Sequence, residues 1–276
     1  MDFIHAIILA IVEGLTEFLP ISSTAHMIFT SSVFGIQQDE FVKMFQVSIQ
    51  FGAILAVVVS YYKKFLNFGS VQFYIKLVLA VIPALILGKL FDDKIEAVLE
   101  KPIPIAVVLI LGGIVFLFID KVFKNTEIDE EPQITRKSAI IIGFWQCLAM
   151  MPGTSRAAAS IIGGMQQKFT MRMAAEFSFF LAVPTMFAVT CYSVFLKDWE
   201  LTDKVTNKIT EVKGYEMLFD GNNLTLFLVG NVIAFIVAML AIKFFIEVLK
   251  KYGFKMWGWY RIILGIAFIA YETILK

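Results

Sequence analysis

The sequence predicts an all-α polytopic membrane protein, and three observations lead to that fold class. Hydrophobic residues make up 59% of the 276 positions and charged residues only 17%, whereas soluble domains have about 45–50% and about 25%. The apolar residues gather in runs long enough to cross a bilayer core, which takes about 20 residues. Two further apolar stretches are interrupted near their middle by a proline. In chain order we expect apolar segments at 3–19, 22–35, 43–62, 73–91, 103–122, 138–151, 155–166, 172–196, 224–249 and 258–275.

The first two segments, 3–19 and 22–35, are separated by Pro20. Proline removes a helical hydrogen bond, and the residue before it leaves the helical region as well. Irregular backbone at membrane depth is tolerated only where protein or water satisfies its polar groups. We therefore predict that residues 3–35 form a re-entrant hairpin, which turns near the midplane and returns to the side that it came from.

Three segments of spanning length follow, and the same order then repeats around Pro152. The second half has the broken pair 138–151 and 155–166, followed again by three long segments. A shift of 132 residues places Pro20 on Pro152, Ser23 on Ser155 and Phe45 on Phe177. Three crossings are an odd number, so the second half enters the membrane from the opposite side, which makes an inverted-topology repeat.

The predicted architecture is thus a single membrane domain, 1–276, with a first repeat at 1–125 and a second, inverted repeat at 136–276. Each half has a re-entrant hairpin and three transmembrane helices, giving six spanning helices and four re-entrant half-helices. The substrate site is expected where the two broken elements meet.

Charge predicts an orientation in the membrane. Basic residues gather on the side reached after segment 43–62, among them Lys63, Lys64, Arg136, Lys137 and Lys251. The positive-inside rule places that side in the cytoplasm. Both termini, the loop 197–223 and the opening of the first hairpin then face outward. We expect Trp257, Trp259 and Tyr260 to anchor the inner interface, where aromatic residues are enriched. The net charge of +1 gives no reason to expect a nucleic-acid partner.

The first break carries ionisable side chains inside an apolar run. Glu13 and Glu17 lie four residues apart and share one helix face. Two close carboxylates repel one another unless a cation lies between them or one of them is protonated. The main hypothesis is that the two glutamates bind a divalent cation, Mg²⁺ or Ca²⁺, which is held partly by their oxygens and partly by substrate oxygens. A structural pair bonded to the second hairpin and a proton relay are the alternatives.

Ser22 and Ser23 follow the same break and precede a new helix. One of them is expected to cap that helix, and the other is then free to act as a nucleophile. The free N–H groups of the helix N-terminus suit an incoming phosphate. His26 lies three residues after Ser23, hence on the same face, and is a candidate general acid or base. We select Ser23, His26 and Glu17 as catalytic candidates and Ser22 as a substrate-binding one.

The second break reads Pro152-Gly153-Thr154-Ser155-Arg156. Thr154 or Ser155 is expected to cap the next helix, and Gly153 allows close backbone approach. Arg156 lies near the expected midplane and must find an anion, either Glu13, Glu17 or a substrate phosphate. We select Gly153, Thr154, Ser155 and Arg156 as substrate-binding candidates.

These groups together predict phosphoryl transfer to water, in which positioning and charge neutralisation supply most of the rate. A transporter or flippase for a lipid phosphate is the alternative, because inverted repeats with broken helices are common in transporters. Release of phosphate by detergent-solubilised protein, without any gradient, distinguishes the two.

The two motifs closely resemble those of the bacitracin-resistance type of undecaprenyl-diphosphate phosphatase. The matching runs are Glu13-Gly-Leu-Thr-Glu17-Phe-Leu-Pro20-Ile-Ser22-Ser23-Thr-Ala-His26 and Pro152-Gly-Thr-Ser155-Arg156, with further similarity at Phe45–Gln50, Gln146–Ala149 and Glu176–Pro184. The resemblance covers essentially the full length. It maps the family's glutamates, serine, histidine and arginine onto Glu13, Glu17, Ser23, His26 and Arg156.

The resemblance implies a multi-pass enzyme of the bacterial inner membrane with its active site facing outward. Such an enzyme hydrolyses undecaprenyl diphosphate to undecaprenyl phosphate and phosphate with a divalent cation. The reaction recycles the lipid carrier of cell-wall synthesis and confers bacitracin resistance. Its partners are the polyprenyl diphosphate and membrane lipids, and a homodimer is a candidate assembly.

The sequence departs from the family pattern after Arg156. The family usually continues with Ser-Gly and then a Thr two residues on, whereas this chain has Ala157-Ala158-Ala159-Ser160. A phosphate contact from a hydroxyl at position 157 therefore does not carry over, and Ser160 is the candidate to replace the threonine. Ala25 replaces a glycine common before the histidine, a change that a helix tolerates well.

Overall fold

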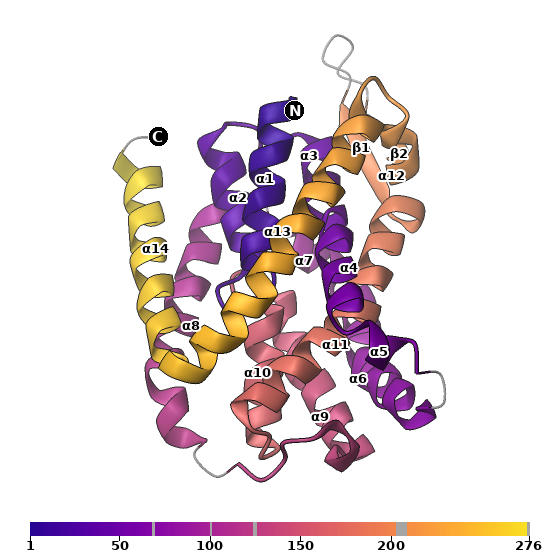
Figure 1. Ribbon diagram of the computed structural model, residues 1–276. Helices are drawn as coiled ribbons and strands as arrows, with labels where there is room; N and C mark the ends of the chain where they lie inside the picture. The colour runs from indigo at the N-terminus through magenta and orange to yellow at the C-terminus, as the bar shows by residue number, and fades with distance from the viewer. Residues whose placement is uncertain (68–69, 100, 124–125, 203–208, 275–276) are drawn as a thin grey trace.

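Helices make up nearly all of the computed structural model, which describes every residue except 68–69, 100, 124–125, 203–208 and 275–276 (Figure 1). Each of the ten predicted apolar segments is mainly helical, and the segment 43–62 is divided between two consecutive helices. The first half contains α1 (Phe3–Thr16), α2 (Ser23–Val33), α3 (Glu40–Ser48), α4 (Gln50–Ser60), α5 (Tyr62–Phe65), α6 (Val71–Leu90), α7 (Asp92–Leu99) and α8 (Pro102–Val122). The second contains α9 (Arg136–Cys147), α10 (Arg156–Gln166), α11 (Met171–Cys191), α12 (Gly214–Leu218), α13 (Asn223–Tyr252) and α14 (Lys255–Ile274).

Five of the six predicted spanning segments correspond to helical stretches that, among the described residues, are long and apolar enough to cross a membrane. The sixth, α14, has 20 residues but is not among them, and it carries Arg261 and Glu272. The five stretches are Glu40–Ser60, Val71–Leu90, Pro102–Val122, Met171–Leu196 and Asn223–Leu249.

The all-α prediction misses one element in the segment 197–223. Strand β1 (Asp198–Thr202) pairs antiparallel with β2 (Ile209–Lys213), with Trp199 opposite Val212 in the register. The indole of Trp199 is buried and donates a 2.9 Å hydrogen bond to the carbonyl of Ser193, in the π-helical turn Tyr192–Leu196 that extends α11. This hairpin is therefore anchored to the helical bundle. Residues 203–208, which complete the predicted loop, lie outside the described residues.

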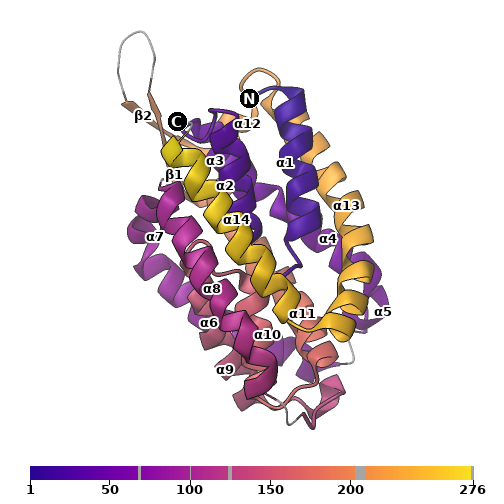
Figure 2. The ribbon, with the colours of Figure 1, turned by 90° about the vertical axis from the view of Figure 1, so that its left-hand side faces the viewer.

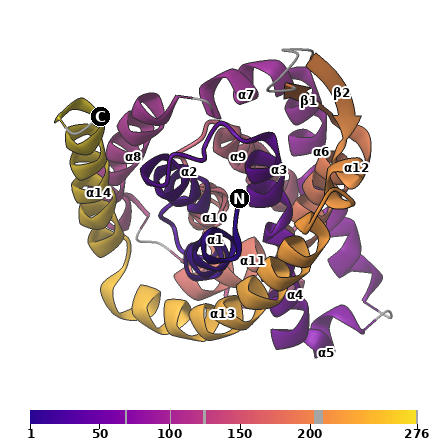
Figure 3. The ribbon, with the colours of Figure 1, turned by 90° about the horizontal axis from the view of Figure 1, so that it is seen from above.

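The helices pack as pairs that join the two halves of the chain. Helix α8 packs against α14, α1 against α13, and α6 against α9, while α4 contacts both α11 and α13. The side view in Figure 2 shows α14 running alongside α8. Seen from above, α2 and α10 lie inside an outer set that includes α8, α13 and α14 (Figure 3). Outer helices expose large apolar side chains such as Leu111, Leu228, Leu240 and Ile263, which suits contact with lipid.

Two ends of the molecule can be distinguished in Figure 1. The N-terminus, the C-terminus and the β-hairpin lie at one end, together with α1 and α2, whereas α5 and α9 lie toward the other. At that second end Glu131, in the 3-10 turn Glu131–Gln133, accepts hydrogen bonds of 2.8 Å from both Lys64 and Lys76. The ends of the two broken helix pairs meet between these extremes.

Candidate active site at the two helix breaks

Each break ends in a serine that caps the following helix. Ser22 accepts a hydrogen bond from the backbone N–H of Ala25 at 3.4 Å, and Ser155 accepts one from Ala158 at 3.2 Å. Both serines have a positive φ, 68° and 78°, which is costly for a residue with a Cβ atom. The predictions that Ser22 or Ser23 caps the first helix and that Thr154 or Ser155 caps the second are therefore confirmed, with Ser22 and Ser155 as the caps.

The caps correct the residue alignment of the two breaks. The shift that places Pro20 on Pro152 places Ser23 on Ser155, whereas the structure makes Ser22 the counterpart of Ser155. The reason is that the second break has one more residue between its proline and its cap. Ser23 and Arg156 are consequently equivalent, and each is the first residue of its helix.

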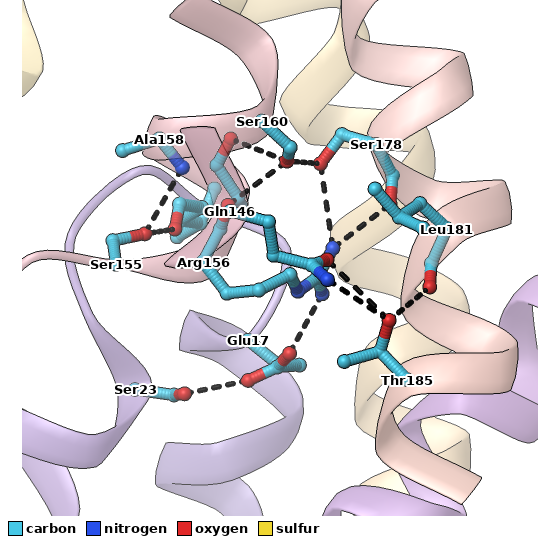
Figure 4. Close-up of polar contacts among 12 residues, drawn as sticks. Glu17, Ser23, Gln146, Ser155, Arg156, Ala158, Ser160, Ser178, Leu181 and Thr185 are labelled. Carbon is cyan, nitrogen blue, oxygen red and sulfur yellow. Dashed lines mark hydrogen bonds and ion pairs between the residues drawn. The ribbon is translucent and has the colours of Figure 1, made fainter. Parts of the chain in front are cut away.

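Glu17 joins the two breaks through one buried carboxylate (Figure 4). Its Oε2 atom accepts a hydrogen bond from the Oγ of Ser23 at 2.6 Å, and its Oε1 atom forms an ion pair with Nη2 of Arg156 at 2.7 Å. All three side chains are buried. The sequence left Glu13, Glu17 and a phosphate as candidate anions for Arg156. The structure pairs it with Glu17 and not with Glu13, and its contact with a phosphate stays a prediction.

Arg156 is oriented by a second set of contacts on α11. Its Nη1 atom donates to the backbone carbonyl of Ser178 at 2.8 Å and to the Ser178 hydroxyl at 3.3 Å. Ser160 in turn donates to the hydroxyl of Ser178 at 2.7 Å (Figure 4). The Nε atom is buried and has no hydrogen-bond partner among the described residues. The guanidinium is thus held in place while its Nε–H group is left for a ligand.

Glu13 lies one helical turn before Glu17, and its side chain is completely buried. Within the described part of the chain, neither of its carboxylate oxygens has a hydrogen-bond partner. Such an orphaned buried carboxylate fits a site for a cation. The described residues contain no group of three or more acidic, histidine or cysteine side chains that could enclose a metal, so other ligands would have to come from substrate or water.

His26 points its two ring nitrogens at groups other than the Ser23 hydroxyl, which donates to Glu17. Nδ1 lies 2.8 Å from the carbonyl of Ser22, and Nε2 lies 2.8 Å from the hydroxyl of Tyr260. A carbonyl only accepts, so Nδ1 carries a proton and the neutral imidazole accepts from Tyr260 at Nε2. The catalytic role of His26 stays a prediction, and its contacts place it between the first break and α14.

Two neighbouring residues of α14 lie at the breaks, and the sequence did not single out Arg261. The placement of Tyr260 at the inner membrane interface stays a prediction, and its hydroxyl forms a hydrogen bond with His26 at the first break. Trp257, expected beside it, is buried and packs against Phe245. Arg261 has no exposed surface and donates to the carbonyls of Gly153 and Thr154. An arginine inside the apolar segment 258–275 was the available signal.

The remaining predicted residues, Gly153, Thr154 and Ser155, all lie at the contact between the breaks. Gly153 has a φ of 95°, a conformation that glycine adopts readily. The Ser155 hydroxyl is also 3.5 Å from the carbonyl of Leu19 in the first break. The structure therefore gives these residues roles in holding the breaks together, and their contact with substrate stays a prediction.

Comparison with known proteins shows the family to which this sequence is similar. The sequence matches the family described as bacitracin resistance protein BacA over residues 6–267. A Flavobacterium psychrophilum protein named undecaprenyl-diphosphatase is 49% identical over 272 residues, covering 98% of this chain and 95% of the relative. Proteins of the same name from Porphyromonas gingivalis W83 and Wolinella succinogenes are 46% identical over 282 residues and 44% identical over 277 residues. They cover 96% and 100% of this chain, and 95% and 100% of their own lengths.

Proposed function

This chain belongs to the BacA family of bacitracin-resistance proteins, and we propose that it hydrolyses undecaprenyl diphosphate at the buried cluster of Glu17, Ser23 and Arg156. It is a multi-pass bacterial membrane protein and a hydrolase. The observation that carries the assignment of the site is the Glu17 carboxylate, which bonds a serine hydroxyl and a guanidinium at the meeting point of two helix N-termini. These are a nucleophile, a base and an anion-binding group in contact with one another.

Ser23 is the nucleophile in this proposal. Its Oγ atom attacks the terminal phosphorus of the diphosphate while its proton passes to Oε2 of Glu17, which already accepts its hydrogen bond at 2.6 Å. The new bond joins Oγ to phosphorus, and the bond to the bridging oxygen breaks, so that undecaprenyl phosphate leaves. Water then attacks the phosphoserine, which restores the Ser23 hydroxyl and releases phosphate.

Arg156 and the two helix N-termini bind the phosphate oxygens in this proposal. The Nε atom of Arg156 is a buried donor with no partner among the described residues, and guanidinium groups bind phosphate tightly. Helices α2 and α10 both begin at the site, so their free N–H groups and positive dipole ends favour an anion there. In this arrangement the guanidinium of Arg156 contacts both the substrate phosphate and the Oε1 atom of Glu17.

A divalent cation, Mg²⁺ or Ca²⁺, is part of the proposal. Glu13, Glu17, Arg156 and Arg261 are all buried and carry formal charges that sum to zero, so they leave the charge of a diphosphate uncompensated. Glu13, with its two unpartnered oxygens, would hold the ion together with Glu17. The bound ion would neutralise phosphate oxygens and the charge that develops on the leaving group.

His26 is the second acid–base candidate. In the alternative to a serine nucleophile, a water molecule attacks the phosphorus directly with His26 as its base. In its neutral form the imidazole has an accepting Nε2 atom, as a base requires, but Tyr260 occupies that atom in this structure. Detection of phosphoserine at position 23 separates the two routes.

The inverted repeat is also a proposal, with the halves at 1–125 and 136–276. Exchange of the two halves would turn the α1–α13 contact into the α9–α6 contact, and both are present. It would map the α8–α14 and α4–α11 pairs onto themselves. Gly14 of α1 and Gly143 of α9 support it, because an added Cβ atom would collide with the backbone of α13 and of α6.

The orientation of the site toward the outside of the cell is proposed from the distribution of charge. One end of the molecule would face the cytoplasm because it carries basic residues, namely Lys63, Lys64, Arg136 and Lys137. The end with both termini and the β-hairpin would face outward (Figure 1). The first hairpin then opens outward. A homodimer remains an expectation from the family resemblance alone.

The function is tested with purified protein in detergent, undecaprenyl diphosphate and a phosphate-release assay. We expect phosphate release without a membrane gradient, and a phosphorylated Ser23 peptide by mass spectrometry after rapid acid quenching. Ser23→Ala should lose at least roughly 1,000-fold in kcat, while the matched control Ser31→Ala on the same helix should stay within about twofold of the parent. Absence of phosphate release, combined with lipid movement in vesicles, would establish the flippase instead.

A further inference from the structure

We propose that Arg261 is a positioning residue that ties the two helix breaks together and thereby sets Ser23 and Arg156 at their working separation. This inference deepens the proposed function and rests on it. It concerns a residue of α14, outside both sequence motifs.

Arg261 bonds the backbone of both breaks at once. Its Nη1 atom donates to the carbonyl of Pro20 at 3.1 Å in the first break and to that of Thr154 at 3.0 Å in the second. Its Nη2 atom donates to the carbonyl of Gly153 at 2.7 Å. One guanidinium is therefore a direct bridge between segments that come from opposite halves of the chain.

The bridge also extends to the helix that packs beside α14. The Nε atom of Arg261 donates to the carbonyl of Leu109 in α8 at 3.2 Å. The guanidinium carbon lies 4.8 Å from the ring centroid of Phe116, also in α8, in a cation–π contact. The charge is thus fixed against α8, and the breaks are held relative to the packed α8–α14 pair.

The number of donors separates Arg261 from Arg156. A guanidinium has five N–H groups, and Arg261 makes four hydrogen bonds, all to backbone carbonyls. It has no exposed surface. Arg156 instead has a buried Nε atom without a partner in the described part of the chain. Arg156 is therefore suited to bind a phosphate, whereas Arg261 is committed to the protein.

The bonded carbonyls lie directly before the reactive residues. Pro20 precedes Ser23 by three positions, and Gly153 precedes Arg156 by three. A broken helix within a membrane has carbonyls that need partners from elsewhere in the protein. Without Arg261, three carbonyls of the two breaks would lose their partner, and each break would be free to move. Misplacement of about 1 Å can cost about 100-fold in rate.

A glycine on α8 makes room for the bridge. A Cβ atom added at Gly112 would collide with Nη2 of Arg261 and lie 2.9 Å from its Cζ atom. The Gly112→Ala variant therefore displaces the guanidinium while keeping the arginine. Gly265 provides the matched control, because its added Cβ atom would meet Ile110 and Ala106 at the same α8–α14 interface without touching Arg261.

The kinetic test compares Arg261→Met, Arg261→Lys and Gly112→Ala with the parent enzyme. We expect kcat to fall by roughly 100-fold in Arg261→Met, with KM changed by less than about threefold, and an intermediate loss in Arg261→Lys, which keeps the charge but has fewer donors. Gly112→Ala should lower kcat more than Gly265→Ala does. The surface control Arg136→Met should leave kcat and KM within about twofold of the parent.

Three results would overturn the proposal. A rise in KM at constant kcat would make Arg261 a substrate ligand, unchanged kinetics would make it dispensable, and equal losses in Gly112→Ala and Gly265→Ala would trace the effect to loosened packing. If Arg261→Met does not fold, the comparison of the two glycine variants decides.

A distance measurement tests the bridge without using activity. Spin labels at Leu15→Cys and Met151→Cys, both exposed positions beside the two breaks, report their separation by pulsed electron resonance. Cys147 and Cys191 are first replaced by serine, because both are free thiols. We expect a narrow distribution in this background and a broad or shifted one with Arg261→Lys or Gly112→Ala. An unchanged distribution refutes the bridge, whereas a parent that releases no phosphate refutes the proposed function and leaves this readout intact.

Discussion

Ser22 and Ser155 occupy equivalent positions at the two helix breaks, each capping the helix that follows with a positive φ, 68° and 78°. Because the caps correspond, the residues after them correspond too, and both of these contact Glu17. The same local turn therefore presents a hydroxyl from one half of the chain and a guanidinium from the other to a single carboxylate.

The strained cap at Ser155 predicts different outcomes for two small substitutions. Ser155→Ala removes the hydrogen bond to Ala158 and keeps a side chain at a positive φ, so it should lower the free energy of unfolding by about 1 kcal/mol. Ser155→Gly also removes the bond, but glycine adopts a positive φ readily and is a fair cap. It should be more stable than Ser155→Ala by thermal unfolding in detergent. The reverse order would contradict the role of the cap.

Glu17→Gln should abolish most activity and also destabilise the fold. The substitution removes the base for Ser23 and leaves the Arg156 guanidinium buried without an anion. Loss of a general base costs about 10²–10⁴-fold in rate, and breaking one partner of a buried ion pair costs about 3–5 kcal/mol. Phosphate release and unfolding temperature should fall together. Glu40→Gln, whose partner Lys43 is on the same helix, is the control and should change neither by much.

Glu13→Gln should weaken the response to a divalent cation. The parent, stripped with a chelator, is expected to lose phosphate release and to regain it with Mg²⁺ or Ca²⁺. The variant should need at least roughly 10-fold more cation for half-maximal recovery, because the unpartnered Glu13 oxygens are its proposed ligands. Calorimetric titration of the cation supplies a readout that does not depend on turnover. Equal cation requirements in both proteins would remove Glu13 from the metal site.

Tyr260→Phe should have a modest effect that reports on His26. The change removes a 2.8 Å hydrogen bond to Nε2 and keeps the ring that stacks on the imidazole. Such a bond contributes about 0.5–1.5 kcal/mol, so kcat should fall about 2- to 12-fold. Tyr252→Phe, at an exposed position on α13, serves as the control. A loss as large as that of His26→Ala would mean that the phenol itself takes part in the reaction.

Glu131 should stabilise the fold in a way that depends on pH. Burial raises the pKa of Glu131. The hydrogen bonds and charges of Lys64 and Lys76 lower this pKa by a larger amount, so the net pKa lies below the ordinary value. Its folded-state pKa is thus below its unfolded-state value of about 4.3. The stabilisation is present above that pH and is lost as pH falls through the lowered pKa.

Glu131→Gln should therefore lower the free energy of unfolding at pH 7 by about 1–3 kcal/mol, and its difference from the parent should shrink below about pH 4. Chemical unfolding across this pH range measures both. Glu127→Gln is the matched control, because Glu127 pairs with Lys168 where both side chains are exposed, and exposed pairs contribute about 0–1 kcal/mol. A constant difference across the pH range would disprove the account.

Much of the fold and of the site was predictable because their signals are local. A run of apolar residues and a proline within it determine where a helix forms and where it ends, so Pro20 and Pro152 located both breaks. A serine directly before a helix is a strong cap signal, which predicted that Ser22 or Ser23 is the cap, and the structure shows that it is Ser22. The β-hairpin was not predicted, because the segment 197–223 is polar and carries charges of both signs, a composition that an irregular loop shares.

The sequence by itself determined the helices, the two breaks and the ionisable residues beside them. Only the tertiary structure decided which of those residues touch: Arg156 with Glu17, His26 with Tyr260, and Arg261 with both breaks. The physical reason is that a charge buried in a membrane needs a partner, which the sequence shows, whereas the identity of that partner depends on how distant helices pack. Arg261 is the clearest case, since all four of its hydrogen bonds go to backbone carbonyls, and a carbonyl is present at every residue of the chain.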